Sequence, residues 1–246
     1  AVYPGDTLRS RSTVIGLKQN SSGKTGVIWV KTEGFNQENT MVISFIRWVM
    51  VRKKGPMDVS FKTTVPKLKN VLSASELSIP ESLTFDSYNK VLSGSSYFLN
   101  DYQIGEIINH ADGVTVTESE HVMATRLWQN TAKVHFDTTA RSDGRRLIYG
   151  GHVISMARAL SFNGLANMQI IAAINSGSHA NPCFAGDTIY AWSEVLDTAQ
   201  TRISSIGAIR LRLVATKGAV GLLRDENNKY YDDIFLDLDY WAFVPI

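Results

Sequence analysis

The feature that most constrains the fold of this chain is an internal repeat with an offset of 181 residues. Residues 2–8 and 183–189 share a Gly-Asp-Thr core, and each copy continues into an apolar stretch. The same offset aligns Gly26 with Gly207, and each of these glycines opens an alternating segment. Aligned segments in the same order indicate a duplication, so both copies are expected to contain the same strands.

A third pair of segments completes each copy. Residues 44–49 resemble residues 236–241 and follow after an insertion in the second copy. Apolar and polar residues alternate in the predicted strands of each copy. An example is residues 209–213, in the second segment, which read Ile-Arg-Leu-Arg-Leu. Period-two alternation is typical of β-strands, so three long strands are expected per copy. The Gly-Asp-Thr triplets fit a tight turn before a strand, in which Asp bonds its own backbone.

Only the second copy has helical segments upstream of its triplet. Residues 117–120, Thr-Glu-Ser-Glu, form a capping box that predicts a helix running to about Trp128. Capping and the helix dipole account for Glu118 and Glu120, so neither is placed in the catalytic set. A second, buried helix is expected from Gly150. Its apolar residues fall at helical spacing: Val153, Met156, Ala157, Leu160 and Leu165.

A long helix wrapped by an antiparallel sheet is the hot-dog fold, an α+β architecture. Residues 97–246 are expected to form one complete hot-dog unit, and residues 1–54 the C-terminal strands of a first unit. Residues 55–96 are rich in Lys, Ser and Pro and are predicted to be a linker. The expectation is therefore a tandem double hot-dog whose first unit is incomplete here, with the natural protein continuing upstream of Ala1.

Composition narrows the partners and the compartment. The net charge of +2 argues neither for nor against a polyanionic partner. No apolar run approaches the roughly 18–20 residues of a membrane span, so no membrane partner is expected. Cys183 is the single cysteine, which excludes an intramolecular disulfide and favours a cytoplasmic location.

The most informative stretch for chemistry lies between the two predicted helices. His135 lies in a loop just ahead of Gly150-Gly151-His152. Adding water to an enoyl thioester, or removing it, needs a base near neutral pH, and imidazole suits that role. Negative charge also develops on the thioester oxygen. Backbone N–H groups at a helix start can stabilise that charge, and glycine allows the ligand to approach closely.

The loop resembles the signature of the MaoC-like, R-specific enoyl-CoA hydratases, D-x-N-P-x-H. His135 matches the histidine of that signature, and Asn130 stands where the aspartate would be. Ala132 replaces the asparagine and Thr131 the residue before it. Asn130 cannot act as a carboxylate base, so the usual Asp/His pair is not present in this loop.

The chain also resembles, over nearly its whole length, the double-hot-dog β-methylmalyl-CoA dehydratases, which are also called mesaconyl-CoA hydratases. The matching stretches are residues 15–27, 129–136, 149–167 and 184–197. The resemblance implies reversible dehydration of β-methylmalyl-CoA to mesaconyl-CoA without a metal or redox cofactor, with coenzyme A as part of the substrate. It also implies two fused hot-dog units, and we expect further assembly into a homodimer. The expected partner is an acyl-CoA thioester, and no nucleic acid is expected.

Catalytic roles are assigned on the motif positions. His135 is predicted to be the general base and acid. Asn130 is expected either to hold the water or substrate hydroxyl or to cap the preceding helix. Gly151, together with the N–H of His152, is the predicted oxyanion site, although a glycine pair also suits a closely packed helix start. The His152 side chain either faces the substrate or lies on the first helical turn.

Arginines are the expected partners of the anionic parts of the substrate. Arg126 and Arg158 are candidates for the free carboxylate, because a guanidinium binds a carboxylate in bidentate geometry. Arg145 and Arg146 are candidates for the phosphates of coenzyme A, although a solvated loop charge would equally explain them.

Three other functions compete with this prediction. One is an R-specific enoyl-CoA hydratase with a different acyl preference. A second is a hot-dog acyl-CoA thioesterase, which would position a carboxylate for attack of water, whereas this loop offers Asn130 and His135. The third is a non-catalytic acyl-CoA-binding subunit, which is supported only by the missing aspartate. The retained His135 and Gly151 favour a hydratase.

Overall fold

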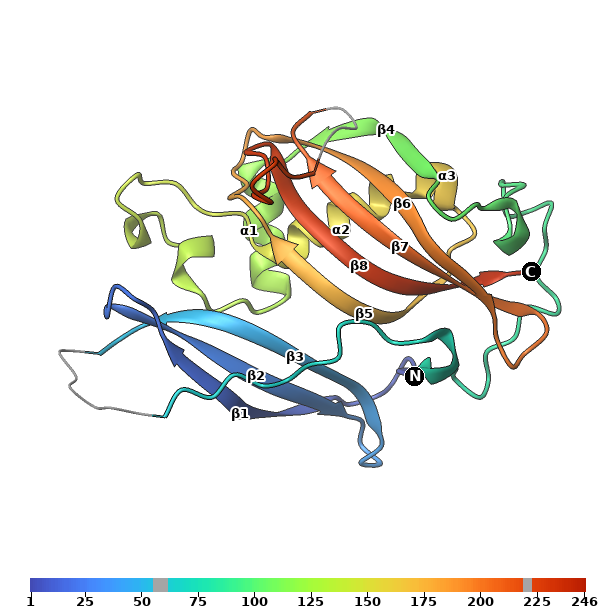
Figure 1. Cartoon of the computed structure of the whole chain (residues 1–246), viewed down its shortest axis with the longest axis horizontal. Helices are drawn as coiled ribbons and strands as arrows, with labels where there is room; N and C mark the ends of the chain where they lie inside the picture. Colours follow the sequence, from blue (N-terminus) through green and yellow to red (C-terminus); the bar gives the residue numbers. More distant parts are fainter. Residues whose placement is uncertain (55–61, 219–222) are drawn as a thin grey trace. The chain divides into compact units, whose positions relative to one another are not determined.

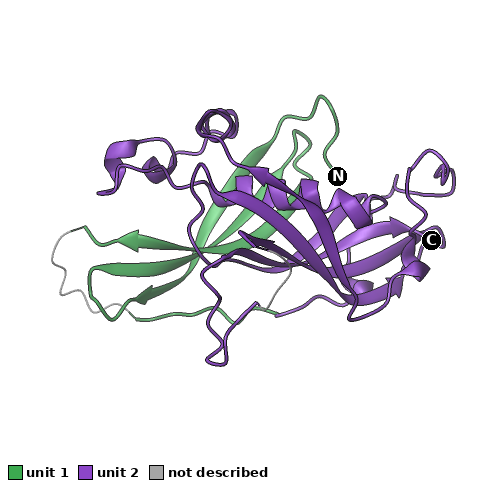
Figure 2. Ribbon diagram, turned by 90° about the horizontal axis from the view of Figure 1, so that it is seen from above, with its two compact units in different colours: residues 1–69 green, residues 70–246 purple. Residues whose placement is uncertain are grey.

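The computed structural model describes residues 1–54, 62–218 and 223–246. The chain divides into two compact units, residues 1–69 and residues 70–246 (Figure 2). No helix in the described part of the chain is long and apolar enough to cross a membrane.

Unit 1 is a three-stranded antiparallel sheet in the order β1-β2-β3 (Figure 1). Its strands are β1 (Arg9–Gln19), β2 (Thr25–Phe35) and β3 (Met41–Arg52). Thr64 pairs with Leu17 on the outer edge of β1 through backbone hydrogen bonds of 2.8 and 2.9 Å.

Unit 2 is a five-stranded antiparallel sheet with helices on one face. The strand order is β4-β6-β7-β8-β5. The strands are β4 (Ile107–Thr115), β5 (Ile170–His179), β6 (Thr188–Gln200), β7 (Ile206–Thr216) and β8 (Ile234–Pro245). The helices are α1 (Glu118–Leu127), α2 (Gly150–Leu160) and α3 (Phe162–Leu165), with 3₁₀ turns η1 (Ala74–Glu76), η2 (Leu99–Asp101), η3 (Lys133–His135) and η4 (Thr138–Ala140).

The predicted duplication is visible in the strand pairing. The β1–β2 register shifts between Val14 and Gly16, and the β6–β7 register shifts between Val195 and Asp197, which is the same place at the offset of 181. A bulge is a specific local feature of a strand pair. Its recurrence at the equivalent position therefore confirms that the two hairpins share one design.

The turn before each hairpin also recurs. The Asp6 carboxylate accepts the N–H of Tyr3 at 2.9 Å, and the Asp187 carboxylate accepts the N–H of Phe184 at 2.8 Å. The glycine between them has a φ of 97° in the first copy and 92° in the second. This conformation favours glycine, and the prediction of a tight turn closed by Asp is confirmed.

The strand pairing of β3 and β8 differs by one residue from the alignment of residues 44–49 with residues 236–241. Trp48 pairs with Trp29, and Trp241 pairs with Arg210, which is the equivalent of Trp29. The offset of the third strand is therefore 193 rather than the 192 that matches residue 44 with residue 236. The insertion lies in the β7–β8 connection, and no local sequence signal fixes its length. Trp48 and Trp241 are therefore equivalent by strand pairing.

Helix α2 forms the centre of unit 2 and packs against β6, β7, β4 and β8. Val153 and Ala157 are buried against apolar side chains from the sheet, such as Leu211. Figure 1 shows α2 running across one face of the sheet, which confirms the hot-dog architecture. The helix ends earlier than its apolar spacing suggests, because Asn163 is extended and Gly164 has a φ of 98°.

The other face of the sheet is covered by a segment that we predicted as linker. Leu77 and Ile79 are buried against Trp241 and Phe243 on that face. The Trp241 indole donates a hydrogen bond to the Leu72 carbonyl at 3.0 Å. Residues 70–96 thus belong to compact unit 2, so the boundary between units lies at residue 69/70 and not near residue 97.

Candidate active site

Histidines gather at the start of α2, where four of the five histidines of the chain lie close together. We call His121, His135, His152 and His179 the histidine cluster. The ring of His121 is 6.4 Å from that of His135 and 6.0 Å from that of His152, between centroids. The His179 ring lies against Gly150, at 2.2 Å from where a Cβ on that residue would be.

The loop places His135 with one nitrogen bound and the other free. Its Nδ1 lies 2.8 Å from the Leu147 carbonyl oxygen. A carbonyl only accepts, so Nδ1 carries the proton and Nε2 presents a lone pair. The loop itself is closed by the Leu147 N–H, which donates to the Val134 carbonyl at 2.9 Å. The structure thus fixes the tautomer that a general base requires.

The start of α2 presents unpaired backbone donors. In the described structure the N–H groups of Gly150 and Gly151 have no hydrogen-bond acceptor, as expected for the first turn of a helix. The N–H of His152, which we expected in the oxyanion site, donates to the Tyr149 carbonyl at 2.9 Å. The donors left for a developing oxyanion are therefore those of Gly150 and Gly151.

Tyr149 covers this helix start and was not among the predicted residues. A Cβ on Gly151 would lie 2.3 Å from its ring, so a larger residue there would have to displace the Tyr149 side chain. The centroid of the Tyr149 ring lies 6.1 Å from that of His135 and 6.5 Å from that of His152. Burial raises the pKa of the phenol, so Tyr149 stays protonated and can donate.

His121 is a fully buried member of the histidine cluster that the sequence interpretation also missed. Its Nε2 accepts the Tyr149 N–H at 3.1 Å, and its Nδ1 is enclosed without a partner. Burial, and after it the neighbouring His152 and His135, lower the pKa of His121 to about 4. The ring is therefore neutral near pH 7 and holds the backbone just ahead of α2.

Glu120 joins the two helices of the site. Its side chain completes the predicted capping box, accepting the Thr117 N–H at 3.3 Å. Its other carboxylate oxygen lies 3.1 Å from Nε2 of His152, which is buried. Capping thus explains the contact of one carboxylate oxygen, and the contact of the other oxygen with His152 is one that the capping box does not explain.

Asn130 uses its side-chain oxygen to shape the loop. Its Oδ1 accepts the N–H of Ala132 at 3.0 Å, and its own N–H donates to the Thr125 carbonyl at 3.0 Å. The side-chain contact is local and lies in the loop, whereas the backbone N–H binds a carbonyl in the last turns of α1, so the side chain itself does not cap that helix. The oxygen is thereby engaged, and only the amide N–H₂ remains to bind a ligand.

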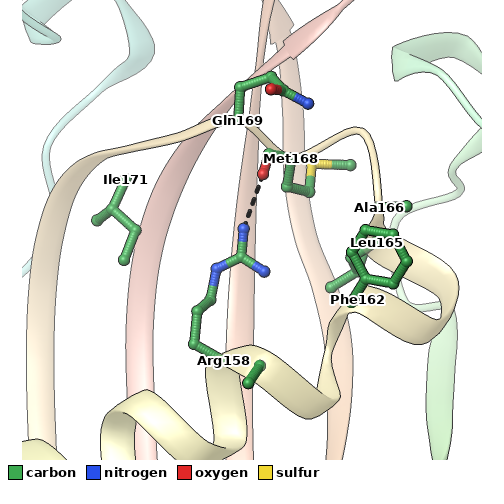
Figure 3. A pocket seen from close by; sticks show the side chains of 8 residues that line it. Arg158, Phe162, Leu165, Ala166, Met168, Gln169 and Ile171 are labelled. Atoms are coloured by element: carbon green, nitrogen blue, oxygen red, sulfur yellow. Dashed lines mark hydrogen bonds between the residues drawn. The ribbon is translucent and has the colours of Figure 1, made fainter. Parts of the chain in front are cut away.

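Arg158 lies at the other end of α2 from the histidine cluster. At 1.5 Å per residue it begins about 10 Å beyond Gly151 along the helix. Its guanidinium donates to Ser161 Oγ at 2.7 Å and to the Met168 carbonyl at 2.9 Å. Figure 3 shows it reaching towards Met168 in a cavity of about 580 Å³ that Phe162 and Ile171 also line. The structure does not bring Arg158 to the catalytic loop.

The other three predicted arginines lie on α1 and in the loop before α2. Arg146 forms an ion pair with Glu118 at 2.7 Å. Arg145 lies over the Phe184 ring, 3.8 Å from its centroid. Arg126 is exposed on α1 and makes no ion pair with the described residues.

Comparison with known proteins agrees with this geometry. The family model described as mesaconyl-CoA hydratase matches residues 1–219. The chain belongs to the mesaconyl-CoA hydratase family. A curated family member from Cereibacter sphaeroides, named mesaconyl-CoA hydratase, is 61% identical over 99% of this chain and 72% of its own length. The β-methylmalyl-CoA dehydratase of Chloroflexus aurantiacus is 51% identical over 99% of this chain and 71% of its own.

Solved structures give the same fold for the family. A putative MaoC domain protein dehydratase from Chloroflexus aurantiacus matches with a TM-score of 0.94 and 50% identity, over 99% of this chain and 72% of that one. A Mycobacterium tuberculosis protein described as having a double hot-dog fold matches with a TM-score of 0.67 and 22% identity, over 98% of this chain and 70% of that one. The fold of this mesaconyl-CoA hydratase family member is therefore of the MaoC-like double hot-dog type.

No group of three or more His, Cys, Asp or Glu side chains in the described residues is arranged to hold a metal ion.

Proposed function

We propose that this chain catalyses the reversible hydration of mesaconyl-CoA to β-methylmalyl-CoA. The observation that carries the proposal is His135, whose Nε2 is free as a base beside the unpaired N–H groups at the start of α2. The curated relatives that share 61% and 51% of its residues are named for this reaction in its two directions.

The described groups account for the chemistry of dehydration. The N–H groups of Gly150 and Gly151 bind the thioester oxygen and stabilise the negative charge that develops there, with the positive end of the α2 dipole behind them. Nε2 of His135 removes the proton from Cα, and the electron pair left behind forms the Cα–Cβ double bond. The hydroxyl on Cβ takes up a proton from a second acid and leaves as water. Hydration follows the same steps in reverse. Proton transfer of this kind needs no redox cofactor and no metal, and coenzyme A belongs to the substrate.

We assign arginines to the anionic parts of the substrate according to their position in the fold and the ion pairs they already form. We propose Arg145 for the phosphates of coenzyme A, since it forms no ion pair with the described residues; Arg146, tied to Glu118, is the second candidate. For the substrate carboxylate Arg126 is the better candidate, because Arg158 lies in the last turn of α2 and its guanidinium is already bound to Ser161 and Met168. His152 is proposed to face the substrate.

We also propose that the protein is a cytoplasmic homo-oligomer. The edge strand β5 exposes Ile170, Ile171 and Ile174, and an apolar strand edge suits pairing with another copy. The single buried Cys183 supports a reducing compartment. Light scattering of the purified protein tests the oligomeric state.

The deciding experiment follows the enoyl absorbance of mesaconyl-CoA, with His135→Gln measured beside the wild type. The expected result is loss of absorbance with the wild type and a drop of about 10²-fold or more in the variant. Turnover of crotonyl-CoA but not of mesaconyl-CoA would support an R-specific hydratase of different acyl preference. Release of free thiol would support a thioesterase, and binding of the thioester without turnover a binding subunit.

A further inference from the structure

Elimination of water moves two protons, and His135 accounts for only one of them. One proton leaves Cα, and another must reach the Cβ hydroxyl, because hydroxide is a poor leaving group. The loop residue Asn130 cannot supply it, since an amide does not exchange a proton in this range and its oxygen is engaged by Ala132. A second proton-transfer group is therefore needed close to His135.

His152 has the geometry of such a group. Its Nε2 donates to the Glu120 carboxylate at 3.1 Å, across 32 residues of sequence and from the first turn of α2 to the first turn of α1. Its Nδ1 has no hydrogen-bond partner in the described structure, yet it is not one of the enclosed unpartnered atoms. The imidazole thus has one nitrogen on a carboxylate and the other open, an arrangement that fixes the ring and stabilises its charged form during proton transfer.

The position of His152 matches that of His135. Both rings lie within 6.5 Å of the same two rings, those of His121 and Tyr149. Both lie at the α2 start, where the thioester oxygen is expected to bind. A substrate held there has one imidazole for each of the two protons.

The other two histidines of the cluster do not suit the role. His121 has its Nε2 bound to the Tyr149 N–H and its Nδ1 enclosed. His179 has no carboxylate partner among the described residues, and burial together with the neighbouring His135 lowers its pKa, which disfavours the charged form that an acid needs. Only His152 combines an open nitrogen with a carboxylate behind it.

We infer that Glu120 and His152 form the second proton-transfer pair of this site, with His152 as the acid for the departing hydroxyl and Glu120 as its positioning residue. The inference rests on the proposed function. In dehydration His135 takes the Cα proton, and that electron pair forms the Cα–Cβ double bond. The Cβ–O bond breaks, and the oxygen takes the proton from Nδ1 of His152 and leaves as water. His135 ends protonated and His152 neutral, and exchange with solvent restores both.

The test changes the leaving group of the substrate. A thioester with fluorine in place of the Cβ hydroxyl needs the base but not the acid, because fluoride leaves without a proton. His152→Gln is expected to slow dehydration of the hydroxyl substrate by about 10²-fold or more and Glu120→Gln by about tenfold. Both variants should release fluoride within about threefold of the wild-type rate. His135→Gln should lose both reactions.

Two controls separate chemistry from folding. Glu106→Gln alters a carboxylate that likewise accepts a backbone N–H three residues away, from Gln103 at 3.1 Å, but contacts no histidine. It should leave both rates unchanged. The double variant Glu120→Gln/His152→Gln should be no slower than His152→Gln alone, because the two residues act as a unit.

The outcomes are distinguishable. Equal loss of water elimination and fluoride release in His152→Gln would assign the pair a structural role, and normal dehydration in that variant would remove it from the reaction; either overturns the inference alone. Silence of the wild type on mesaconyl-CoA and crotonyl-CoA overturns the proposed function and the inference with it.

Discussion

His121 is held neutral by its surroundings, and this has a consequence for the stability of the protein. The ring is fully buried beside His135 and His152, and burial lowers its pKa from about 6.5 to about 4. In the unfolded chain the same imidazole takes up a proton near pH 6.5. The unfolded state therefore binds more protons than the folded state between these two pH values.

The first prediction concerns this pH window. The stability that neutral His121 contributes is complete above pH 6.5 and is lost as the pH falls towards 4, by an amount on the order of 2–3 kcal/mol. His121→Gln keeps an acceptor for the Tyr149 N–H but has no proton to gain. Denaturant unfolding at pH 7, 6, 5 and 4 should therefore show a shallower loss of stability for the variant. Parallel curves for the two proteins would contradict the assignment.

At the scale of residues, the sequence indicates functional groups that lie close together in the chain. It does not indicate groups whose contacts join residues far apart in the sequence. His135 and the glycines at the start of α2 could be proposed from the sequence because an imidazole and a glycine-started helix lie close together in the chain. His121 and Glu120 were not, since their contacts with Tyr149 and His152 cross 28 and 32 residues. Asn130 showed a departure from the MaoC-like signature, but the sequence did not show which carboxylate stands near the site instead.

The second prediction concerns the start of α2. A Cβ on Gly151 would lie 2.3 Å from the Tyr149 ring, so Gly151→Ala must displace that ring from the helix start. Overpacking of this kind costs about 1–3 kcal/mol of unfolding free energy. Movement of the donor N–H groups should also lower kcat by about 10- to 100-fold. Denaturant unfolding and steady-state kinetics measure the two effects.

A second substitution checks the cause of this effect. In a Tyr149→Ala background the ring is gone, and Gly151→Ala should then cost little further stability. If the cost stays the same in both backgrounds, the glycine is required by the backbone and not by Tyr149.

At the scale of elements, local sequence signals predicted where the helices start. They did not predict where α2 ends. The capping box at Thr117 and the glycine start of α2 were both confirmed, because each signal acts within one turn. The end of α2 was not predicted, since the apolar spacing continues to Leu165 while Asn163 and Gly164 leave the helix. The linker interpretation of residues 70–96 failed to detect Leu77 and Ile79, whose burial depends on the distant strand β8.

At the scale of the whole molecule, the duplicated sheets have the same register but unequal burial. Ile43 and Leu236 are equivalent by strand pairing, since they lie opposite Gly34 and Ala215. Leu236 is fully buried, whereas Ile43 is 54% exposed. In unit 2 the equivalent face holds α2, whose Val153 and Ala157 belong to the same core as Leu236. Within residues 1–246 the same strand design is thus buried in unit 2 and exposed in unit 1, and the repeat alone does not reveal this difference.

The third prediction uses this equivalence as a matched pair. Leu236→Ala leaves a cavity in a closed core and should lower the unfolding free energy of unit 2 by about 2–5 kcal/mol. Ile43→Ala removes a side chain that is half in solvent and should cost less than about 1 kcal/mol in the chain of residues 1–246. Hydrogen exchange of the strand amides, read for β3 and β8 separately, measures both values. A cost at Ile43 as large as that at Leu236 would mean that the helix-side face of unit 1 is covered in solution, as it is in unit 2. A small cost would show that register and bulges, without a helix against the sheet, are enough to keep these three strands paired.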